Sequence, residues 1–226
     1  MLHKTRGIAI SYIKYKESSI IARIFTEAFG MQSYIVNSVR SSSAKSKIAL
    51  GQKLTILDLV GYHNTKKEIN RSSENKCSFT FRTIPYQIRK SSIAMFLTEL
   101  LYQVLREEGE NEQLFEFVHE SVVLFDRIQE NYENFHLHFM LSLSRFLGIR
   151  PESAKAMMEE VGHRRKFDGI FVEQLNFMLQ SKYGQEQKLT KATRNEILAL
   201  ILDYYRFHYD SIRDLKSIQV LKEVLG

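Results

Sequence analysis

Apolar and polar side chains alternate along much of the first 84 residues, and this period of two is typical of half-buried β-strands. Ile8, Ile10 and Tyr12 share one face of the first predicted strand. Further strands are predicted over 20–26, 31–39, 54–62 and 77–84. Residues 41–47 are predicted to form a flexible basic loop, and the polar stretch 63–76 is predicted to be a hairpin tip.

The apolar period changes to 3.6 from Ser91 onwards, after Pro85 has closed the strand-rich region, and this period indicates α-helix. The first helical stripe comprises Ile93, Phe96, Leu97, Leu100, Leu101, Val104 and Leu105. Gly109 ends this helix. Further helices are predicted over 114–125, 136–147, 173–182 and 192–209.

Three shorter features complete the helical half. Pro151 is placed like the first-turn residue of a short helix. Residues 167–171 interrupt the helical pattern as a loop or a small hairpin. Ser211 and Asp214 form a predicted capping box for a last helix that begins at about Arg213.

These patterns predict an α+β protein with two domains. Residues 1–84 are expected to form a five-stranded β-barrel of the OB type, and residues 85–226 an all-α helical domain. A closed barrel is one arrangement that leaves no strand edge unpaired. The strand pattern alone also fits an SH3-like barrel.

Charge divides the chain along the same line. Residues 1–90 carry 16 Lys and Arg against 5 Asp and Glu, whereas residues 91–226 carry 16 against 21. The first part therefore has a net charge of +11 and the second of −5. A basic β module joined to a mildly acidic helical module indicates a polyanion as the partner of the first and a protein as the partner of the second.

Several classes of site lack the residues that they need. The ten glycines never fall into a GxGxxG or GxxxxGK pattern, no HExxH motif occurs, and Cys77 is the only cysteine. The start of the chain has no secretory pattern, and no apolar run is long enough to cross a bilayer. We therefore expect a cytoplasmic protein with no cofactor and no membrane partner.

Two Glu-x-x-His motifs, Glu116 with His119 and Glu133 with His136, raise one metal hypothesis. Two such motifs and two further helical glutamates build the di-iron carboxylate sites of some four-helix bundles. Nothing in the pattern marks Glu116 or Glu133 as facing inward, and both motifs are flanked by charged residues. We predict no metal site, and a di-iron carboxylate metalloenzyme remains an alternative.

Cations and aromatic side chains are interleaved in the basic half, as in proteins that bind single strands through phosphate contacts and base stacking. The candidate DNA-binding residues are Lys4, Arg6, Lys14, Arg23, Phe25, Tyr34, Arg40, Lys45 and Lys47. Alternation places Arg23 and Phe25 on one strand face. A small barrel also fills its interior with aromatic side chains, so Phe25 and Tyr34 have an alternative place in the core.

A second basic group lies near the end of the helical half. It comprises Lys191, Arg194, Arg206, Arg213 and Lys216. Among these cations lie the apolar or aromatic residues Ile197, Ile201, Tyr204 and Tyr205. The group is predicted to surround a cleft for an acidic peptide with a hydrophobic tip, and a solvated helix face is the alternative.

A series of short segments occurs in a particular order along the chain: GIAI at 7–10, YKESS at 15–19, IFTE at 24–27, YIV at 34–36, FLTELL at 96–101, LREE at 105–108 and LKS at 215–217. Gly30, Arg40, Phe139, Gly148 and Leu221 stand between or after them. In order and spacing, these segments resemble the RecO family of bacterial recombination mediators, over essentially the whole chain.

The resemblance implies an N-terminal OB domain and a C-terminal helical domain. It implies binding of single- and double-stranded DNA, annealing of complementary strands and partnership with RecR. It further implies docking on the acidic C-terminal tail of the single-strand binding protein, help in loading the RecA recombinase, and a cytoplasmic, nucleoid-associated location. None of these activities requires nucleotide hydrolysis, so the predicted function is non-enzymatic.

This chain departs from the pattern of the family in three places. Many members carry a four-cysteine zinc element where residues 167–171 keep only FDGIF, so zinc is expected to be absent. The usual Gln-Pro before the fourth strand is Gln52-Lys53 here. Some members place basic residues ahead of the position of Phe139, where this chain has His-Leu-His at 136–138, so the resemblance does not place the tail-binding cleft.

Two further hypotheses fit the same residues. An RNA-binding module would use the same barrel, because stacking platforms tolerate either sugar. A purely structural adaptor would use its basic half only to stay soluble.

Overall fold

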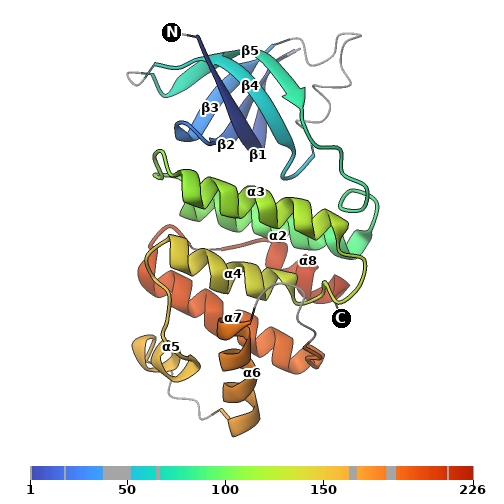
Figure 1. The fold of residues 1–226 in the computed structure, drawn as a ribbon, viewed down its shortest axis with the longest axis vertical. Helices are drawn as coiled ribbons and strands as arrows, with labels where there is room; N and C mark the ends of the chain where they lie inside the picture. Colours follow the sequence, from blue (N-terminus) through green and yellow to red (C-terminus); the bar gives the residue numbers. More distant parts are fainter. Residues whose placement is uncertain are drawn as a thin grey trace.

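A β-barrel is stacked on layers of helices, with the start of the chain on the barrel and the end among the helices (Figure 1). The computed structural model describes residues 2–17, 19–37, 52–64, 67–162, 167–181, 187–212 and 214–225. The strands precede the helices along the chain, which confirms the predicted α+β class.

Five strands close the barrel in the order β1-β2-β3-β5-β4. They are β1 (Leu2–Lys16), β2 (Ser19–Thr26), β3 (Gly30–Val36), β4 (Ile56–Tyr62) and β5 (Ile69–Cys77). The long β1 pairs with β4 through its first half and with β2 through its second half, and a parallel β3–β5 pair completes the ring. The predicted five-stranded OB-type barrel is thus confirmed, and closure gives each described strand a neighbour on both sides over part of its length.

The fifth strand lies at Ile69–Cys77 rather than over the predicted 77–84. The prediction of a hairpin tip over 63–76 is therefore wrong for most of that stretch. β5 has the sequence INRSSENKC and buries only Asn70 among its side chains. Backbone hydrogen bonds to β3 and β4 hold β5 in the barrel. Because such bonds do not require apolar side chains, the sequence of β5 shows no alternation of apolar and polar residues.

Part of the predicted third strand and of the connection that follows it cannot be compared with the fold. β3 ends at Val36, and residues 38–39 of the predicted range lie outside the described residues. The predicted basic loop over 41–47 also lies outside them.

Gly30 marks the closest approach between the barrel and the helical half. Its φ angle is +64°, and a Cβ atom there would lie 2.1 Å from the Glu108 carbonyl oxygen. The neighbouring Met31 N–H donates to this same oxygen at 3.1 Å. Only glycine fits both the backbone conformation and the space, so this position anchors β3 to the loop that follows the first helix.

The described part of the second half contains helices at each predicted position. They are α2 (Ile88–Val104), α3 (Glu112–Arg127), α4 (Phe135–Phe146), α5 (Ala154–Glu160), α6 (Gly169–Gln180), α7 (Lys191–His208) and α8 (Ser217–Val224). The side chains of Asn111, Ser153, Asp168 and Thr190 accept backbone N–H groups at the starts of α3, α5, α6 and α7.

Two predicted helix starts are wrong because a different residue caps the helix. Pro151 precedes α5 by three positions, and the Ser153 hydroxyl accepts the Ala156 N–H instead. Residues 167–171 are not a hairpin, because Asp168 caps α6 and accepts the Phe171 N–H.

The last helix begins at Ser217 rather than at about residue 213. The carboxylate of Glu99 on α2 accepts the backbone N–H groups of Lys216 and Ser217 at 2.9 Å each. The Ser211 hydroxyl donates to the Gln103 carbonyl, so the predicted capping box is not formed. A tertiary contact, which the local sequence does not reveal, caps α8.

One buried cluster joins the barrel to the helices. Ile8, Phe25 and Leu54 of the barrel half belong to the same apolar cluster as the buried faces of α2, α3, α4 and α7. A smaller cluster around Ile24 and Leu59 fills the rest of the barrel. This shared core fixes the barrel on the helices. The predicted domain boundary after residue 84 falls between β5 and α2, and it stays a prediction.

Candidate nucleic-acid interface

The face of the barrel formed by β2 and β3 carries a polar groove, named here the barrel groove. It consists of two hollows of about 680 Å³ and about 570 Å³ that share His63, Asn64 and Lys67. The first hollow reaches Arg23 on β2 and Tyr102 near the end of α2. The second follows β3 and β5. OB folds bind oligonucleotides on this strand 2–3 face and its adjoining loops.

Cations line the barrel groove along its length. They are Arg23, Lys67, Arg71 and Arg106, set against the acidic residues Glu68 and Glu110. Lys67, Arg71 and Arg106 are exposed, whereas Arg23 is half-buried. The Arg23 guanidinium lies over the Tyr102 ring, with its Cζ atom 4.7 Å from the ring centre. This contact holds a barrel cation against the helical half, so both halves of the chain form the groove.

Aromatic rings accompany these cations. Phe29 and His63 are stacked with ring centres 3.9 Å apart and an angle of 11° between their planes. His3 meets Phe29 edge-on at 5.3 Å. Burial, and then the charge of His3, lower the pKa of His63, which favours the neutral ring. Tyr62 is 56% exposed in the lining of the second hollow and offers a ring to a base.

The outer end of β1 provides a second set of accessible cations and rings. Tyr12 and Tyr15 are 44% and 49% exposed, and Lys14 and Lys16 are also exposed. This part of β1 pairs with β2 alone, with Lys14 opposite Ile20 and Lys16 opposite Ser19. The Lys16 ammonium lies 5.5 Å from the centre of the Tyr15 ring. Cations and aromatic faces therefore alternate along this strand as they do in the groove.

Two family models match the chain, one over the barrel and one over the first part of the helical half. The model described as "Recombination protein O N terminal" matches residues 1–81, which contain all five described strands. The model described as "Recombination protein O C terminal" matches residues 85–157. The chain belongs to the RecO family.

Relatives of this RecO family member match it over their whole length. "DNA repair protein RecO" of Phocaeicola vulgatus is 34% identical over 244 residues, covering 100% of each chain. The proteins of the same name from Bacteroides fragilis and Flavobacterium johnsoniae are each 33% identical, covering 99% of each chain. The resemblance predicted from short segments is thus confirmed, and it places the chain in a family of DNA repair and recombination proteins.

Three of the predicted DNA-binding residues of this RecO family member are accessible cations. Lys4 and Lys14 are exposed on β1, and Arg23 lies in the barrel groove. Arg40, Lys45 and Lys47 lie outside the described residues. The placement of DNA on any of these residues stays a prediction.

Two predicted stacking residues are contradicted by the fold. Phe25 is 0% and Tyr34 is 1% exposed, so neither ring can meet a base. Phe25 points into the core shared with the helices and lies 5.7 Å from the Phe115 ring. Burial raises the pKa of Tyr34 to about 12. The alternation of apolar and polar residues did not reveal that closure of the barrel covers Tyr34 or that packing of the helices covers Phe25.

Arg6 is engaged within the protein. Its guanidinium donates to both oxygens of Glu27, at 2.6 Å and 2.9 Å, and to Glu116 on α3. These hydrogen bonds raise its pKa and lower that of Glu27. Because two carboxylates already balance its charge, Arg6 is better placed to join the barrel to α3 than to bind phosphate.

The groove residues Lys67 and Arg71 were missed because they lie in the polar stretch assigned to a hairpin tip. Arg106 and Tyr102 were missed because they belong to the helical half. The only sequence signal for the first pair is the position of Lys67 between the fourth and fifth strands, where OB folds carry a binding loop, whereas Arg71 lies within β5. No local signal exists for the second pair.

Three of the predicted peptide-binding residues lie around a hollow of about 590 Å³ between α7 and α8, named here the α7–α8 hollow. They are Lys191, Arg206 and Lys216, and Lys222 joins them, set against the acidic residues Asp214 and Glu223. Its apolar lining consists of Leu215 and Ile218. The four apolar or aromatic residues expected to form the cleft, Ile197, Ile201, Tyr204 and Tyr205, are buried in the core instead.

Arg194, another member of the predicted basic group, does not line this hollow. Arg194 is half-buried and donates to the Asn134 side-chain oxygen at 2.9 Å and to two backbone carbonyls at 3.4 Å. Arg213 lies outside the described residues.

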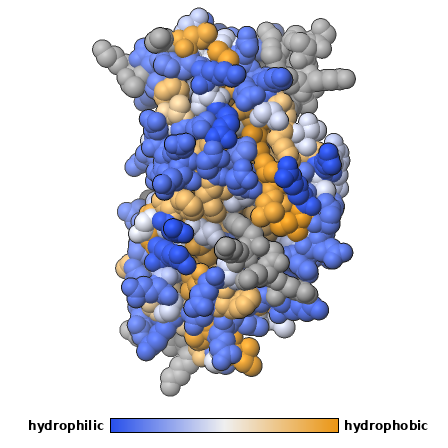
Figure 2. Space-filling view, in the orientation of Figure 1, coloured by the Kyte–Doolittle hydropathy of each residue, from blue (hydrophilic) through white to orange (hydrophobic). Residues whose placement is uncertain are grey.

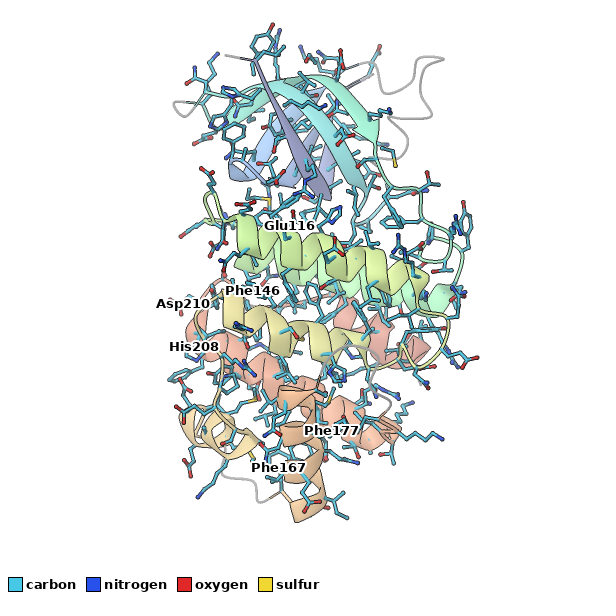
Figure 3. All side chains as sticks on the ribbon, viewed as in Figure 1. Glu116, Phe146, Phe167, Phe177, His208 and Asp210 are labelled. Atoms are coloured by element: carbon cyan, nitrogen blue, oxygen red, sulfur yellow. The ribbon has the colours of Figure 1, made fainter. Side chains whose placement is uncertain are left out.

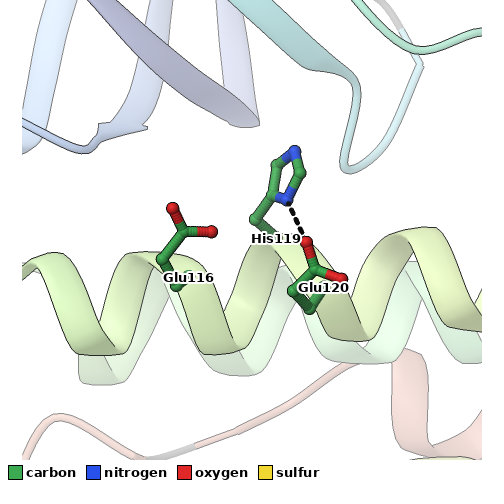
Figure 4. A group of neighbouring side chains, drawn as sticks. All are labelled: Glu116, His119 and Glu120. Atoms are coloured by element: carbon green, nitrogen blue, oxygen red, sulfur yellow. Dashed lines mark hydrogen bonds and ion pairs between the residues drawn. The ribbon is translucent and has the colours of Figure 1, made fainter.

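The two Glu-x-x-His motifs do not meet. Glu116, His119 and Glu120 have ligand atoms within 4.8 Å of one another, and the His119 ring nitrogen lies 3.3 Å from Glu120 (Figure 4). Glu133 pairs with Arg89, and His136 is buried beside Phe96. No group of potential ligands in the described residues combines the two motifs, so the di-iron arrangement is not formed there.

Within the described parts of the chain, no helix is both long and apolar enough to cross a membrane.

Proposed function

We propose that this RecO family member is a DNA-binding recombination mediator that catalyses no reaction of its own. It binds single- and double-stranded DNA in the barrel groove and along the outer end of β1. The observation that carries this proposal is the gathering of Arg23, Lys67, Arg71 and the exposed Tyr62 on the ligand-binding face of an OB barrel. A cytoplasmic, nucleoid-associated location is part of the proposal, because DNA is the ligand.

Binding depends on contacts that every nucleotide offers. The groove cations neutralise phosphates, and released counterions drive association. Exposed rings such as Tyr62 stack on bases, at about 1–3 kcal/mol per base. Neither contact reads base edges, so binding tolerates any sequence. Neutralisation also lowers the repulsion between two strands, and complementary strands held by the protein come close enough to anneal.

The helical half carries the proposed protein partners. An acidic tail with a hydrophobic tip fits the α7–α8 hollow, where Lys191, Arg206, Lys216 and Lys222 surround an apolar lining. We assign the tail of the single-strand binding protein to this hollow. Partnership with RecR and help in loading RecA complete the proposed mediator role, and membership of the RecO family supports them.

The salt dependence of DNA binding tests the groove. A labelled oligothymidylate is titrated with the wild-type protein and with the combined variant Arg23→Ala, Lys67→Ala, Arg71→Ala. The slope of log affinity against log salt should become shallower by about 0.7 for each phosphate that the variant no longer neutralises. The matched control replaces Arg145 and Lys155, which are exposed on α4 and α5, with Ala. An unchanged slope in the groove variant would refute the placement of DNA.

Annealing of complementary oligonucleotides coated with single-strand binding protein separates the two proposed sites. Deleting the acidic tail of the coating protein should slow annealing, as should Lys216→Glu, whereas neither change should alter affinity for bare DNA. A matched oligoribonucleotide that competes as well as DNA would favour the alternative RNA-binding function.

A further inference from the structure

An apolar groove runs along α3 to the end of α4, and no function assigned above uses it. It encloses about 670 Å³ and shares no lining residue with the barrel groove or the α7–α8 hollow. We call it the α3 groove. In Figure 3, Glu116 lies on α3 and Phe146 near the end of α4 below it, on the same side of the molecule.

The floor of the α3 groove is aromatic and aliphatic. Phe117 and Phe146 are stacked with ring centres 4.6 Å apart, and both rings line the groove. Leu124 is 36% exposed two turns further along α3. Figure 2 shows apolar surface on this side of the molecule at the level of α3 and α4, with hydrophilic residues along its border. An amphipathic helix normally buries its large apolar side chains against the core. The apolar side chains that line the α3 groove are instead accessible to a partner.

One edge of the groove is acidic. Glu112, Glu116 and Glu120 follow one another at intervals of four residues, which places them in a row on one face of α3. Glu116 is engaged by Arg6, but Glu112 makes no ion pair within the described residues, and Glu120 has only the weak partner His119. Carboxylates at this spacing repel one another, so the row as a whole favours a cationic neighbour.

We propose that the α3 groove binds a basic amphipathic helix of a partner protein. Its apolar face packs on Phe117, Leu124 and Phe146, and its Lys or Arg side chains meet the glutamate row. The lining runs from Glu112 to Arg127, which corresponds to about 22 Å or four helical turns. The acidic edge repels DNA and an acidic tail alike, so this site is separate from the barrel groove and the α7–α8 hollow.

The test uses a fluorescently labelled 15-residue peptide of Leu, Lys and Ala with blocked ends and Leu placed to form one helical face. A peptide of identical composition with its Leu positions permuted is the matched probe. Anisotropy titrations should show at least tenfold tighter binding of the amphipathic peptide. Equal binding of the two peptides would overturn the proposal, because it would reveal attraction by charge alone.

Protein variants locate the site. Leu124→Gln leaves the charge unchanged and should weaken binding of the amphipathic peptide at least tenfold, and Glu112→Gln with Glu120→Gln should weaken it further. Glu173→Gln, on the exposed side of α6, is the control and should change nothing. Thermal unfolding followed by circular dichroism checks that each variant is folded. Unchanged binding by Leu124→Gln would refute the assignment.

Two further measurements distinguish this proposal from DNA binding and from self-association. Affinity for oligothymidylate should be the same for Leu124→Gln and the wild type, so failure of the peptide test leaves the DNA-binding proposal untouched. Sedimentation velocity at increasing protein concentration checks self-association. If the wild-type protein forms a dimer and Leu124→Gln abolishes it, the α3 groove binds a second copy of this chain, and the proposal of a different partner protein is refuted.

Discussion

The Lys90 ammonium, in the first turn of α2, donates to the backbone carbonyl of Asp126 near the end of α3 at 3.2 Å. Lys90 is 0% exposed and also donates to the carbonyls of Phe125, at 2.9 Å, and Ile128. It therefore satisfies the carbonyl groups at the C-terminal end of α3. Burial lowers the pKa of Lys90, and the Asp126 charge opposes this shift.

The Asp126 carboxylate holds the segment that connects the barrel to α2. It accepts the backbone N–H groups of Arg82, Thr83 and Ile84 at 2.8–2.9 Å. Burial raises the pKa of Asp126, but these hydrogen bonds together outweigh burial and leave it below its ordinary value. Lys90 also donates to the Thr83 hydroxyl at 2.8 Å, so the two charged groups share one partner.

Replacing Lys90 with Met should destabilise the whole chain. The change leaves the buried carbonyl groups of Phe125, Asp126 and Ile128 without their charged donor, so we expect the free energy of unfolding in urea to fall by about 3–5 kcal/mol. Arg89→Met is the control, because Arg89 is exposed and its distance to Glu133 is 3.6 Å. That variant should lose no more than about 1 kcal/mol. Equal decreases in the free energy of unfolding for the two variants would show that the buried hydrogen bonds of Lys90 do not stabilise the fold.

Acid should unfold the protein through two buried histidines. Burial lowers the pKa of His136 to about 3 and that of His138 to about 4, from an ordinary value of 6.5. The folded state therefore binds fewer protons than the unfolded state between these values. The stabilisation is complete above pH 6.5 and decreases as the pH falls towards 4 and 3.

The measurement is the free energy of urea unfolding from pH 7 downwards. Each histidine contributes a slope of up to about 1.4 kcal/mol per pH unit in this window. His136→Gln should flatten the curve by about one such contribution. His119→Gln, at a half-buried position on α3, serves as the comparison. A wild-type curve that is flat between pH 6.5 and about 4.5 would contradict the burial of neutral rings.

Arg6 should contribute to stability rather than to DNA affinity. Arg6→Ala leaves Glu27 and Glu116 facing each other without their shared cation, and we expect a loss of about 1 kcal/mol because the group is partly exposed. The slope of DNA affinity against salt should not change. Lys14→Ala, at the exposed outer end of the same strand, should show the opposite behaviour, with unchanged stability and a shallower slope. A shallower slope for Arg6→Ala would return this residue to the DNA-binding set.

Tyr102 and Arg106 should act differently on DNA although they line the same hollow. Tyr102→Ala removes a ring and no charge, so affinity should fall about tenfold with little change in the salt slope. Arg106→Ala removes a phosphate contact, so the slope should become shallower by about 0.7 on a single strand. Titrations at several salt concentrations measure both quantities. If neither variant differs from wild type, the helical half does not contribute to the DNA groove.

Local pattern in the sequence was sufficient where one face of an element is buried. The apolar stripe from Ile93 to Leu105 predicted α2 within a few residues, because burial of one helix face imposes a period of 3.6. β5 was missed for the converse reason, since eight of its nine side chains are not buried. Helix starts failed where the cap came from elsewhere, as with Glu99 at the start of α8.

The candidate site was only partly accessible to such reasoning. Arg23 was identified from its basic and aromatic surroundings, yet its neighbour Phe25 proved to be core. Alternation states which residues share a strand face, but packing of the helices on the barrel decides which part of that face is covered, and Phe25 lies against Phe115 of α3. The charge excess of the first 90 residues predicts a polyanion as the ligand but indicates no position on the barrel for it.

The amino-acid sequence by itself determined the two-part architecture, the class of barrel and the family, because these depend on local periodicity, composition and the order of short motifs. Only the tertiary structure decided the groove, since parallel pairing of β3 with β5 brings Ser33–Ile35 beside Ile69–Arg71, and packing of α2 brings Tyr102 to Arg23. These contacts join residues far apart along the chain. Their energies depend on distances that exist only after the barrel has closed and the helices have packed against it.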